Sequence, residues 1–239
     1  IGAADSLKTF METPLAQAER GEKVLSDNEL VSLEARDLRI KSPEGKVLAG
    51  PLNFSLPAGK RVVLVGQSGS GKSSLLNTLA GFLPYDGSLM VNGVELRDLD
   101  SQRWHRMLSW VGQNPQLPAA TLRENVLLAW PEATEAQLQL ALDKAWVSEF
   151  ISQLPQGINT PVGDQAARIS VGQAQRIAVA RALLVPCRLL LLDEPGASLD
   201  AHSEQRVMQA LSNASSQQTT LMVTHQLEGI AGWDAIWVM

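Results

Sequence analysis

The order of apolar and polar positions divides the chain into an alternating region and a set of short apolar runs. From Val31 to Leu56 apolar residues alternate with polar ones, interrupted by a turn at residues 42–45, which predicts antiparallel strands. Three runs are apolar or β-branched almost throughout: residues 61–65, 189–192 and 219–223. Such runs indicate strands that are buried on both faces, as in a parallel sheet.

Helical patterns and turns separate these runs. The expected elements are a helix from Lys72, a hairpin turn at residues 92–93, a mostly helical stretch over 121–154, a helix over 170–184 and a strand over 235–239. Thr121, Thr134 and Ser170 are each followed three residues later by Glu or Gln, the spacing of a capping box at a helix start. Strands alternating with helices predict an α/β fold with a mainly parallel sheet.

The two ends of the sequence suggest a piece of a longer protein. Leu7, Phe10, Met11 and Leu15 have helical spacing, and polar residues follow to residue 28, so we expect a helix end and a linker over residues 1–28. The chain begins with Ile1 and ends in an apolar strand with no turn after it. It contains no run of 18 or more apolar residues, the length that indicates a transmembrane helix.

The composition and net charge of the chain exclude some classes of function. With 45% apolar and 19% charged residues, the chain should fold around a sizeable core. The formal net charge of −5 has the wrong sign for broad contact with nucleic acid, so no nucleic-acid partner is expected. Cys187 is the single cysteine and cannot form an internal disulfide, which indicates a reducing compartment. It is either a buried small side chain or a reactive thiol.

Residues 66–73 read Gly-Gln-Ser-Gly-Ser-Gly-Lys-Ser, which matches the P-loop pattern between a predicted strand and a predicted helix. The glycines allow backbone N–H groups to surround phosphate, and the helix start favours negative charge. Lys72 would contact the β- and γ-phosphates, and the Ser73 hydroxyl would bind Mg²⁺. The alternative is a glycine-rich structural turn. The expected nucleotide-binding residues are Gly66, Ser68, Gly69, Ser70, Gly71, Lys72, Ser73 and Ser74.

A second motif places two carboxylates, Asp193 and Glu194, directly after the apolar run 189–192. In a P-loop enzyme Asp193 would support Mg²⁺, and Glu194 would act as the general base toward water. Without the P-loop, the pair would more simply be a solvated loop start or a helix cap. The chain between Lys72 and Asp193 is far longer than one crossover helix and strand require, so the helical stretch over 121–154 is expected to be an insertion.

Four further motifs resemble those of the nucleotide-binding domain of ABC transporters, in the order found in that family. They are residues 111–115 with Gln113, the signature-like residues 169–173, the D-loop-like residues 197–200 and His225 after an apolar strand. Read singly, Gln113 would be a surface side chain and His225 a structural histidine. The resemblance covers residues 31–239. It implies that the catalytic residues are Gln113, Glu194 and His225. It also implies that the Mg²⁺ ligands are Ser73, Gln113 and Asp193.

The resemblance implies a fold and partners. The fold would be a P-loop (RecA-like) core with an antiparallel β subdomain and an inserted helical subdomain at about 114–175, together forming one domain over 29–239. Residues 1–28 would be the end of the last transmembrane helix of the same chain and a linker. Two such domains would enclose two ATP molecules with Mg²⁺, each offering its signature and D-loop to the other's nucleotide; those residues here are Ser170, Val171, Gly172, Gln173 and Asp200.

Three positions depart from the family pattern. Ser42 stands where exporters usually place an aromatic residue against adenine, and Asp164 replaces the usual Glu of a loop that contacts the membrane part. Val171 replaces the first Gly of the signature, and a β-branched residue must keep a negative φ there or store strain. We therefore expect two unequal nucleotide sites formed with a different second subunit.

Residues 50–54, 111–121 and 169–175 are most similar to one subunit of a bacterial heterodimeric exporter. That exporter is associated with cysteine and glutathione, with haem and with cytochrome bd assembly, which implies the cytoplasmic face of the inner membrane. Two alternatives remain: a soluble ABC-type ATPase acting on DNA or ribosomes, and a nucleotide-binding half with little hydrolysis of its own. A P-loop kinase or GTPase would leave Gln113, the signature and His225 unexplained.

Overall fold

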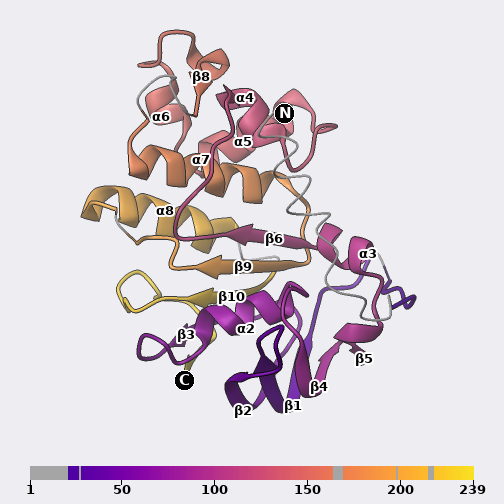
Figure 1. Cartoon of the computed structure of the whole chain (residues 1–239). Helices are drawn as coiled ribbons and strands as arrows, with labels where there is room; N and C mark the ends of the chain where they lie inside the picture. The colour runs from indigo at the N-terminus through magenta and orange to yellow at the C-terminus, as the bar shows by residue number, and fades with distance from the viewer. Residues whose placement is uncertain (1–20, 27, 164–168, 198, 215–217) are drawn as a thin grey trace. The chain divides into compact units, whose positions relative to one another are not determined.

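The computed structural model describes residues 21–26, 28–163, 169–197, 199–214 and 218–239. Its secondary structure is the predicted mixture of helices and strands (Figure 1). The strands are β1 (Leu33–Lys41), β2 (Val47–Leu56), β3 (Arg61–Val65), β4 (Tyr85–Val91), β5 (Val94–Glu95), β6 (Leu108–Val111), β7 (Ala120–Thr121), β8 (Pro161–Val162), β9 (Leu189–Asp193), β10 (Thr219–Val223) and β11 (Ala235–Val238). The helices are α2 (Lys72–Leu79), η1 (Leu96–Asp98), α3 (Ser101–Arg106), α4 (Leu122–Leu127), α5 (Glu135–Lys144), α6 (Ser148–Ile151), η2 (Gly157–Asn159), α7 (Val171–Leu184) and α8 (Ala201–Ala214).

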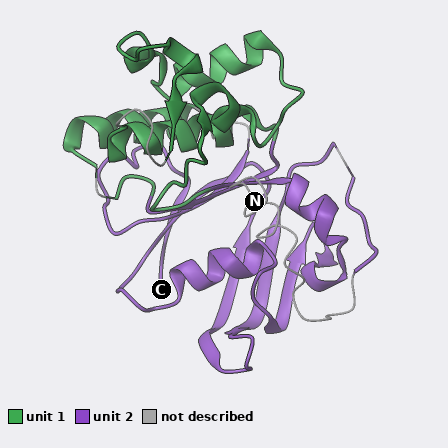
Figure 2. Cartoon of the chain, turned by 45° about the horizontal axis from the view of Figure 1, so that its top comes forward, with its two compact units in different colours: residues 1–17, 111–186, 195–214 green, residues 18–110, 187–194, 215–239 purple. Residues whose placement is uncertain are grey.

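The chain forms two compact units, coloured separately in Figure 2. Of the described residues, unit 1 comprises 111–163, 169–186, 195–197 and 199–214, and unit 2 comprises 21–26, 28–110, 187–194 and 218–239. The expected helix over residues 1–20 lies outside the described residues. Among the helices that the structure describes, none combines the length and apolar character needed to cross a membrane. The predicted boundaries at residues 28, 114 and 175 stay predictions.

Unit 2 contains the predicted antiparallel sheet, in the order β2-β1-β4-β5. Asn92 and Gly93 turn between β4 and β5 with φ of 49° and 78°, the positive pair that a two-residue hairpin requires. The first strand begins at Leu33 rather than at Val31. Val31 is fully buried but lies outside the ladder, and its carbonyl accepts a hydrogen bond from the Thr219 hydroxyl.

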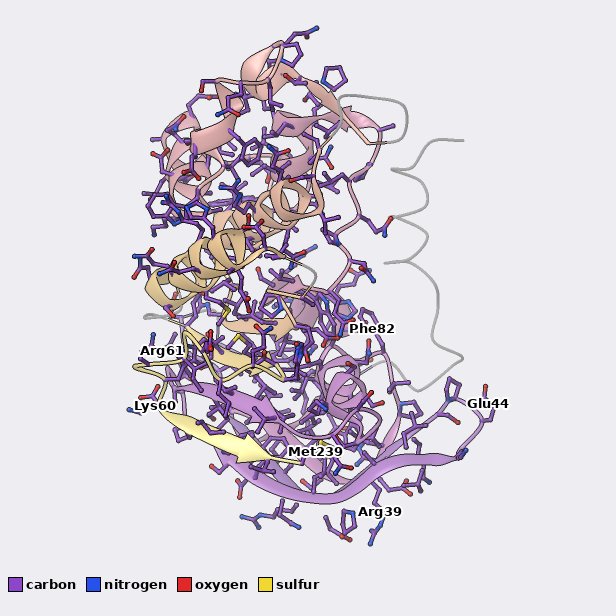
Figure 3. The ribbon with its side chains drawn as sticks, turned by 90° about the vertical axis from the view of Figure 1, so that its left-hand side faces the viewer. Arg39, Glu44, Lys60, Arg61, Phe82 and Met239 are labelled. Atoms are coloured by element: carbon purple, nitrogen blue, oxygen red, sulfur yellow. The ribbon has the colours of Figure 1, made fainter. Side chains whose placement is uncertain are left out.

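The second sheet of unit 2 has the order β11-β3-β10-β9-β6. The apolar runs predicted as buried strands are confirmed as β3, β9 and β10, which pair in parallel, and every residue of β9 and β10 is buried. The strand predicted at the end of the sequence is β11, which runs along β3 from the neighbourhood of Arg61 toward Met239 (Figure 3). Because parallel strands end at one edge, the segments after β3, β9 and β10 lie close together.

Helix α2 connects the two sheets of unit 2. It contacts β1 and β2 of the antiparallel sheet and β9 of the parallel sheet, and it buries Leu75, Leu76 and Leu79 in the shared core. Burying three leucines contributes roughly 1.5–3 kcal/mol each. This packing fixes the start of α2, at Lys72, relative to the ends of the parallel strands.

Unit 1 is mainly helical, with α4 and α5 packed on α7 and α7 packed on α8. The stretch predicted as mostly helical is divided into three short helices, with Trp146 at φ 58° between α5 and α6. Thr134 forms a complete capping box with Gln137. At Thr121 the box is incomplete, because the Glu124 carboxylate accepts from the Thr121 hydroxyl instead of from its N–H group.

Candidate functional site

Three segments of unit 2 follow neighbouring strands at one edge of the parallel sheet. The P-loop follows β3, Asp193 and Glu194 end and follow β9, and His225 follows β10, which lies between β3 and β9 (Figure 1). The Glu194 N–H donates to the Val223 carbonyl at 2.8 Å, so the end of β9 is tied to β10. The sheet thereby brings together residues that are far apart in the sequence.

The P-loop backbone has the form of an anion cradle. Gly69 and Gly71 have φ of 81° and 98°, values that glycine adopts without strain. A Cβ at Gly71 would lie 2.5 Å from the Ala49 Cβ, so a larger residue would also displace β2. Helix α2 begins directly after Gly71, and the first N–H groups of a helix have no acceptor within the helix and favour negative charge.

Lys72 directs its ammonium group back into the loop. Its Nζ donates to the carbonyls of Gly66 and Gln67 at 2.9 and 2.7 Å and lies 3.4 Å from the Ser70 hydroxyl. The residue is only 9% exposed. A charge held among neutral acceptors in this way can exchange them for phosphate oxygens, which bind ammonium more strongly.

Two of the three residues expected to bind Mg²⁺ are in contact with each other. The Ser73 hydroxyl donates to Asp193 Oδ1 at 3.3 Å, which joins α2 to the end of β9. Burial raises the pKa of the Asp193 carboxyl, and the Ser73 hydrogen bond opposes that shift. A hydroxyl and a partly desolvated carboxylate are oxygen donors of the kind that Mg²⁺ takes, so these residues fit the ion. Gln113, the third expected donor, belongs to unit 1.

Glu194 and His225 form a hydrogen-bonded pair. His225 Nδ1 lies 2.8 Å from Glu194 Oε2, and the His225 N–H donates to the same oxygen at 3.4 Å. The Glu194 side chain is 12% exposed and that of His225 62%. Glu194 also has a φ of 49°, a conformation that non-glycine residues adopt at a cost and that is common at active sites. The contacts hold the Glu194 carboxylate in one orientation, and a fixed orientation is what a general base requires.

The signature residues are at the start of α7 in unit 1. Ser170 caps the helix and exchanges hydrogen bonds with Gln173 in a complete capping box, as predicted. Val171 is 55% exposed and does not have a positive φ, so the backbone keeps the unstrained conformation. Gly172 faces α8, where a Cβ would lie 3.1 Å from the Ser203 hydroxyl. Exposed Ser170 and Val171 are therefore free to meet another molecule.

The remaining predicted positions have local structural contacts. Asp200 accepts from the Ser203 N–H at 3.0 Å at the start of α8, and hydrogen bonds with Ser203 lower the pKa of its carboxyl. Gln113 is exposed in a bend after β6. Ser42 forms the turn between β1 and β2 and accepts from the Lys46 N–H at 3.2 Å. Asp164 and Ser198 lie outside the described residues.

Two contacts at these loops involve residues outside the predicted motifs. The Met239 N–H donates to the Val65 carbonyl at 2.9 Å, and the Met239 carbonyl lies against Gly66, where a side chain would collide with it. In unit 1, the buried amide of Gln175 binds the carbonyls of Gly112 and Pro195. A polar residue on an otherwise apolar helix face was the available signal for Gln175.

Comparison with known proteins identifies the family. The sequence model of the family described as ABC transporter matches residues 49–197, which include the P-loop, Asp193 and Glu194. The chain belongs to the ABC transporter family. It is an ATPase domain of that family, as predicted. The predicted P-loop fold is confirmed by similarity to the solved structure of a bacterial Atm1-family ABC exporter with ATP bound. That structure has a TM-score of 0.81 and 28% identity, and the match covers 94% of this chain and 39% of the other.

Curated relatives within the ABC transporter family confirm the predicted resemblance to one exporter subunit. The chain is 74% identical over its whole length to the glutathione/L-cysteine transport system ATP-binding/permease protein CydD of Escherichia coli, of which the match covers 41%. It is 55% identical to the transport ATP-binding protein AarD of Providencia stuartii, again over 100% of this chain and 41% of the relative. The chain thus spans about two fifths of the length of these relatives.

Proposed function

We propose that this chain binds Mg²⁺-ATP at its P-loop and hydrolyses it to drive export of glutathione or cysteine across the bacterial inner membrane, in support of cytochrome bd assembly. The domain would lie at the cytoplasmic face, joined through residues 1–28 to the membrane part of the same chain. A second, different half-transporter subunit would complete both nucleotide sites. The cargo is proposed from the identity of 74% with CydD, whose name states that cargo.

The observation that carries the hydrolytic role is the 2.8 Å contact between Glu194 and His225 at the strand edge beside the P-loop. Lys72 and the amides that begin α2 would bind the phosphates, and Ser73, Asp193 and Gln113 would hold the metal ion. When bound, Mg²⁺ neutralises phosphate charge. Glu194 accepts a proton from the attacking water, and His225 fixes the orientation of that carboxylate.

The test is ATP hydrolysis by the full-length transporter with its partner subunit. Glu194→Gln keeps the size of the side chain and removes the base, so turnover should fall roughly 10²- to 10⁴-fold while nucleotide still binds. Glu132→Gln, on an exposed residue of unit 1, is the matched control and should retain wild-type turnover. An active Glu194→Gln variant would show that another group activates the water.

A further inference from the structure

Gln175 is a buried polar side chain in the second turn of α7. It is 1% exposed, and its Nε2 donates to two carbonyls, those of Gly112 at 3.0 Å and Pro195 at 2.8 Å. Its Oε1 is buried and accepts from no group in the part of the chain that the structure describes. Two converging carbonyls require a donor, so the amide orientation is fixed and only Nε2 joins Gln175 to these loops.

The two carbonyls belong to the chain segments that carry the proposed catalytic residues. Gly112 directly precedes Gln113, and its carbonyl lies in the same rigid peptide plane as the Gln113 nitrogen. Pro195 directly follows Glu194, and its ring fixes φ near −65°. Holding these two carbonyls therefore limits the movement of the Gln113 and Glu194 backbones.

The same carbonyls lie where the chain passes between the two units. One passage is between residues 110 and 111 and another between residues 194 and 195. Gly112 and Pro195 are the first or second residues of unit 1 after these passages, and Gln175 binds both from within unit 1. A single side chain thus joins two entry points of the chain into this unit.

Arg181, also on α7, binds the Gln113 loop on the C-terminal side of Gln113. Arg181 donates to the Gln116 carbonyl at 3.3 Å and to the Asn125 carbonyl at 2.8 Å. Gln113 is therefore flanked by two attachments to α7, at Gly112 and at Gln116. Gln175 differs from Arg181 because it also binds the segment that follows Glu194.

We infer that Gln175 is a positioning residue for ATP hydrolysis. It holds the Gln113 loop and the segment after Glu194 to α7, the helix that Ser170 caps. This inference rests on the proposed function, because it assumes that Gln113 and Glu194 act on ATP. Its consequence is that a displacement of the Ser170 end of α7 reaches both catalytic segments together. Gln175 touches neither nucleotide nor water in this role.

The test uses the full-length transporter with its partner subunit. Gln175→Met keeps the length of the side chain and removes both hydrogen bonds, so kcat should fall about 10²-fold through misplaced catalytic groups, while the KM for ATP and nucleotide affinity stay unchanged. Gln139→Met is the matched control, because the exposed Gln139 amide donates to Asp143 and Ser148 on the surface of unit 1. It should keep wild-type kcat.

Hydrogen exchange separates positioning from general stability. In Gln175→Met, peptides covering residues 110–116 and 193–197 should exchange faster than in Gln139→Met, with the rest of the chain unchanged. If Gln175→Met does not fold, Gln175→Asn takes its place, because its amide is one methylene shorter and cannot reach both carbonyls. A folded Met or Asn variant with wild-type kcat overturns the inference, as does a loss of activity that matches the loss of folded protein.

Measuring Glu194→Gln in parallel distinguishes failure of the inference about Gln175 from failure of the proposed hydrolytic site. If that variant is inactive and Gln175→Met keeps wild-type kcat, only the positioning role of Gln175 is wrong. If Glu194→Gln keeps wild-type turnover, the proposed hydrolytic site is wrong and the inference about Gln175 falls with it. Loss of kcat in both variants with unchanged nucleotide affinity supports both.

Discussion

Asp193 combines a proposed role in Mg²⁺ binding with a cost to stability. It ends β9 with only 9% of its surface exposed, and burial raises the pKa of its carboxyl. The folded chain therefore binds the Asp193 proton more tightly than the unfolded chain does. Ionised Asp193 destabilises the nucleotide-free fold at neutral pH, and a cation bound beside Ser73 would offset this effect.

Replacing Asp193 with Asn should therefore stabilise the nucleotide-free chain. At pH 7 the midpoint of thermal unfolding should rise, because a buried ionised carboxylate is replaced by a neutral amide that still accepts from Ser73. The difference should vanish as the pH falls below the carboxyl pKa of the unfolded chain, about 3.9, where both states are protonated. Thermal unfolding between pH 3 and pH 8 measures this. A lower midpoint at pH 7 than wild type would contradict it.

Ser42 leads to a prediction about the base of the nucleotide. It lies in the turn between β1 and β2 and offers a hydroxyl that is engaged with the Lys46 N–H group. Without an aromatic face at this position, stacking that contributes about 1–3 kcal/mol per base elsewhere is absent. ATP and GTP should therefore bind with similar affinity, which competition against a fluorescent ATP analogue measures. A strong preference for ATP would mean that another residue holds adenine.

At the residue scale, the motif residues were predictable from the sequence, but the residues that hold the motif loops in place were not. Lys72, Glu194 and His225 stand out because each belongs to a short pattern with a fixed neighbour in the sequence. Gln175 does not, since its importance comes from two carbonyls 63 and 20 residues away. The contact of Met239 with Gly66 likewise depends on the pairing of β11 with β3.

Helix α7 carries both kinds of residue: the predicted signature residues and Gln175, which no motif predicted. Its start was predictable from the capping box, and Ser170 and Gln173 form that box in the structure. Its buried face was less predictable, because Gln175 and Arg176 lie among apolar side chains and bind groups outside the helix. The two-residue strands β7 and β8 were missed, because so short a pairing leaves no periodicity to read.

The exposed start of α7 should matter only when the partner subunit is present. Ser170→Arg should leave ATP affinity of the isolated 239-residue chain unchanged, because the family resemblance implies that the signature contacts the nucleotide of the second subunit. In the complete transporter it should reduce ATP hydrolysis, since the bulky side chain would block contact with the partner's nucleotide. Nucleotide titration and ATPase assays on the two preparations test this.

Substitution of Ser170 also removes a helix cap, which costs roughly 0.5–2 kcal/mol. Ser170→Ala is therefore the control for stability, because it loses the cap and the hydroxyl without adding bulk, and Ser170→Arg should reduce ATP hydrolysis further than Ser170→Ala does. If Ser170→Arg weakens ATP binding by the isolated chain while Ser170→Ala does not, the signature acts on the nucleotide of its own chain.

At the scale of the whole molecule, the proposed catalytic groups are divided between the two units. Lys72, Asp193, Glu194 and His225 belong to unit 2, whereas Gln113 and the signature residues belong to unit 1. The sequence predicted the mixed α/β fold and the family because each motif follows or begins a regular element. The contacts within each unit join residues that are far apart in the sequence, and no motif encodes those contacts.

The most direct measurement of the central proposal is transport by inside-out vesicles containing the full-length protein and its partner subunit. Wild-type vesicles should take up radiolabelled glutathione or cysteine when ATP and Mg²⁺ are supplied. Lys72→Ala should abolish this uptake through loss of a charge-assisted phosphate contact, whereas Lys144→Ala, on an exposed lysine of α5, should not change it. ATP-dependent uptake of either thiol that persists in Lys72→Ala vesicles, or no uptake of either thiol by wild-type vesicles that hydrolyse ATP, would contradict the account.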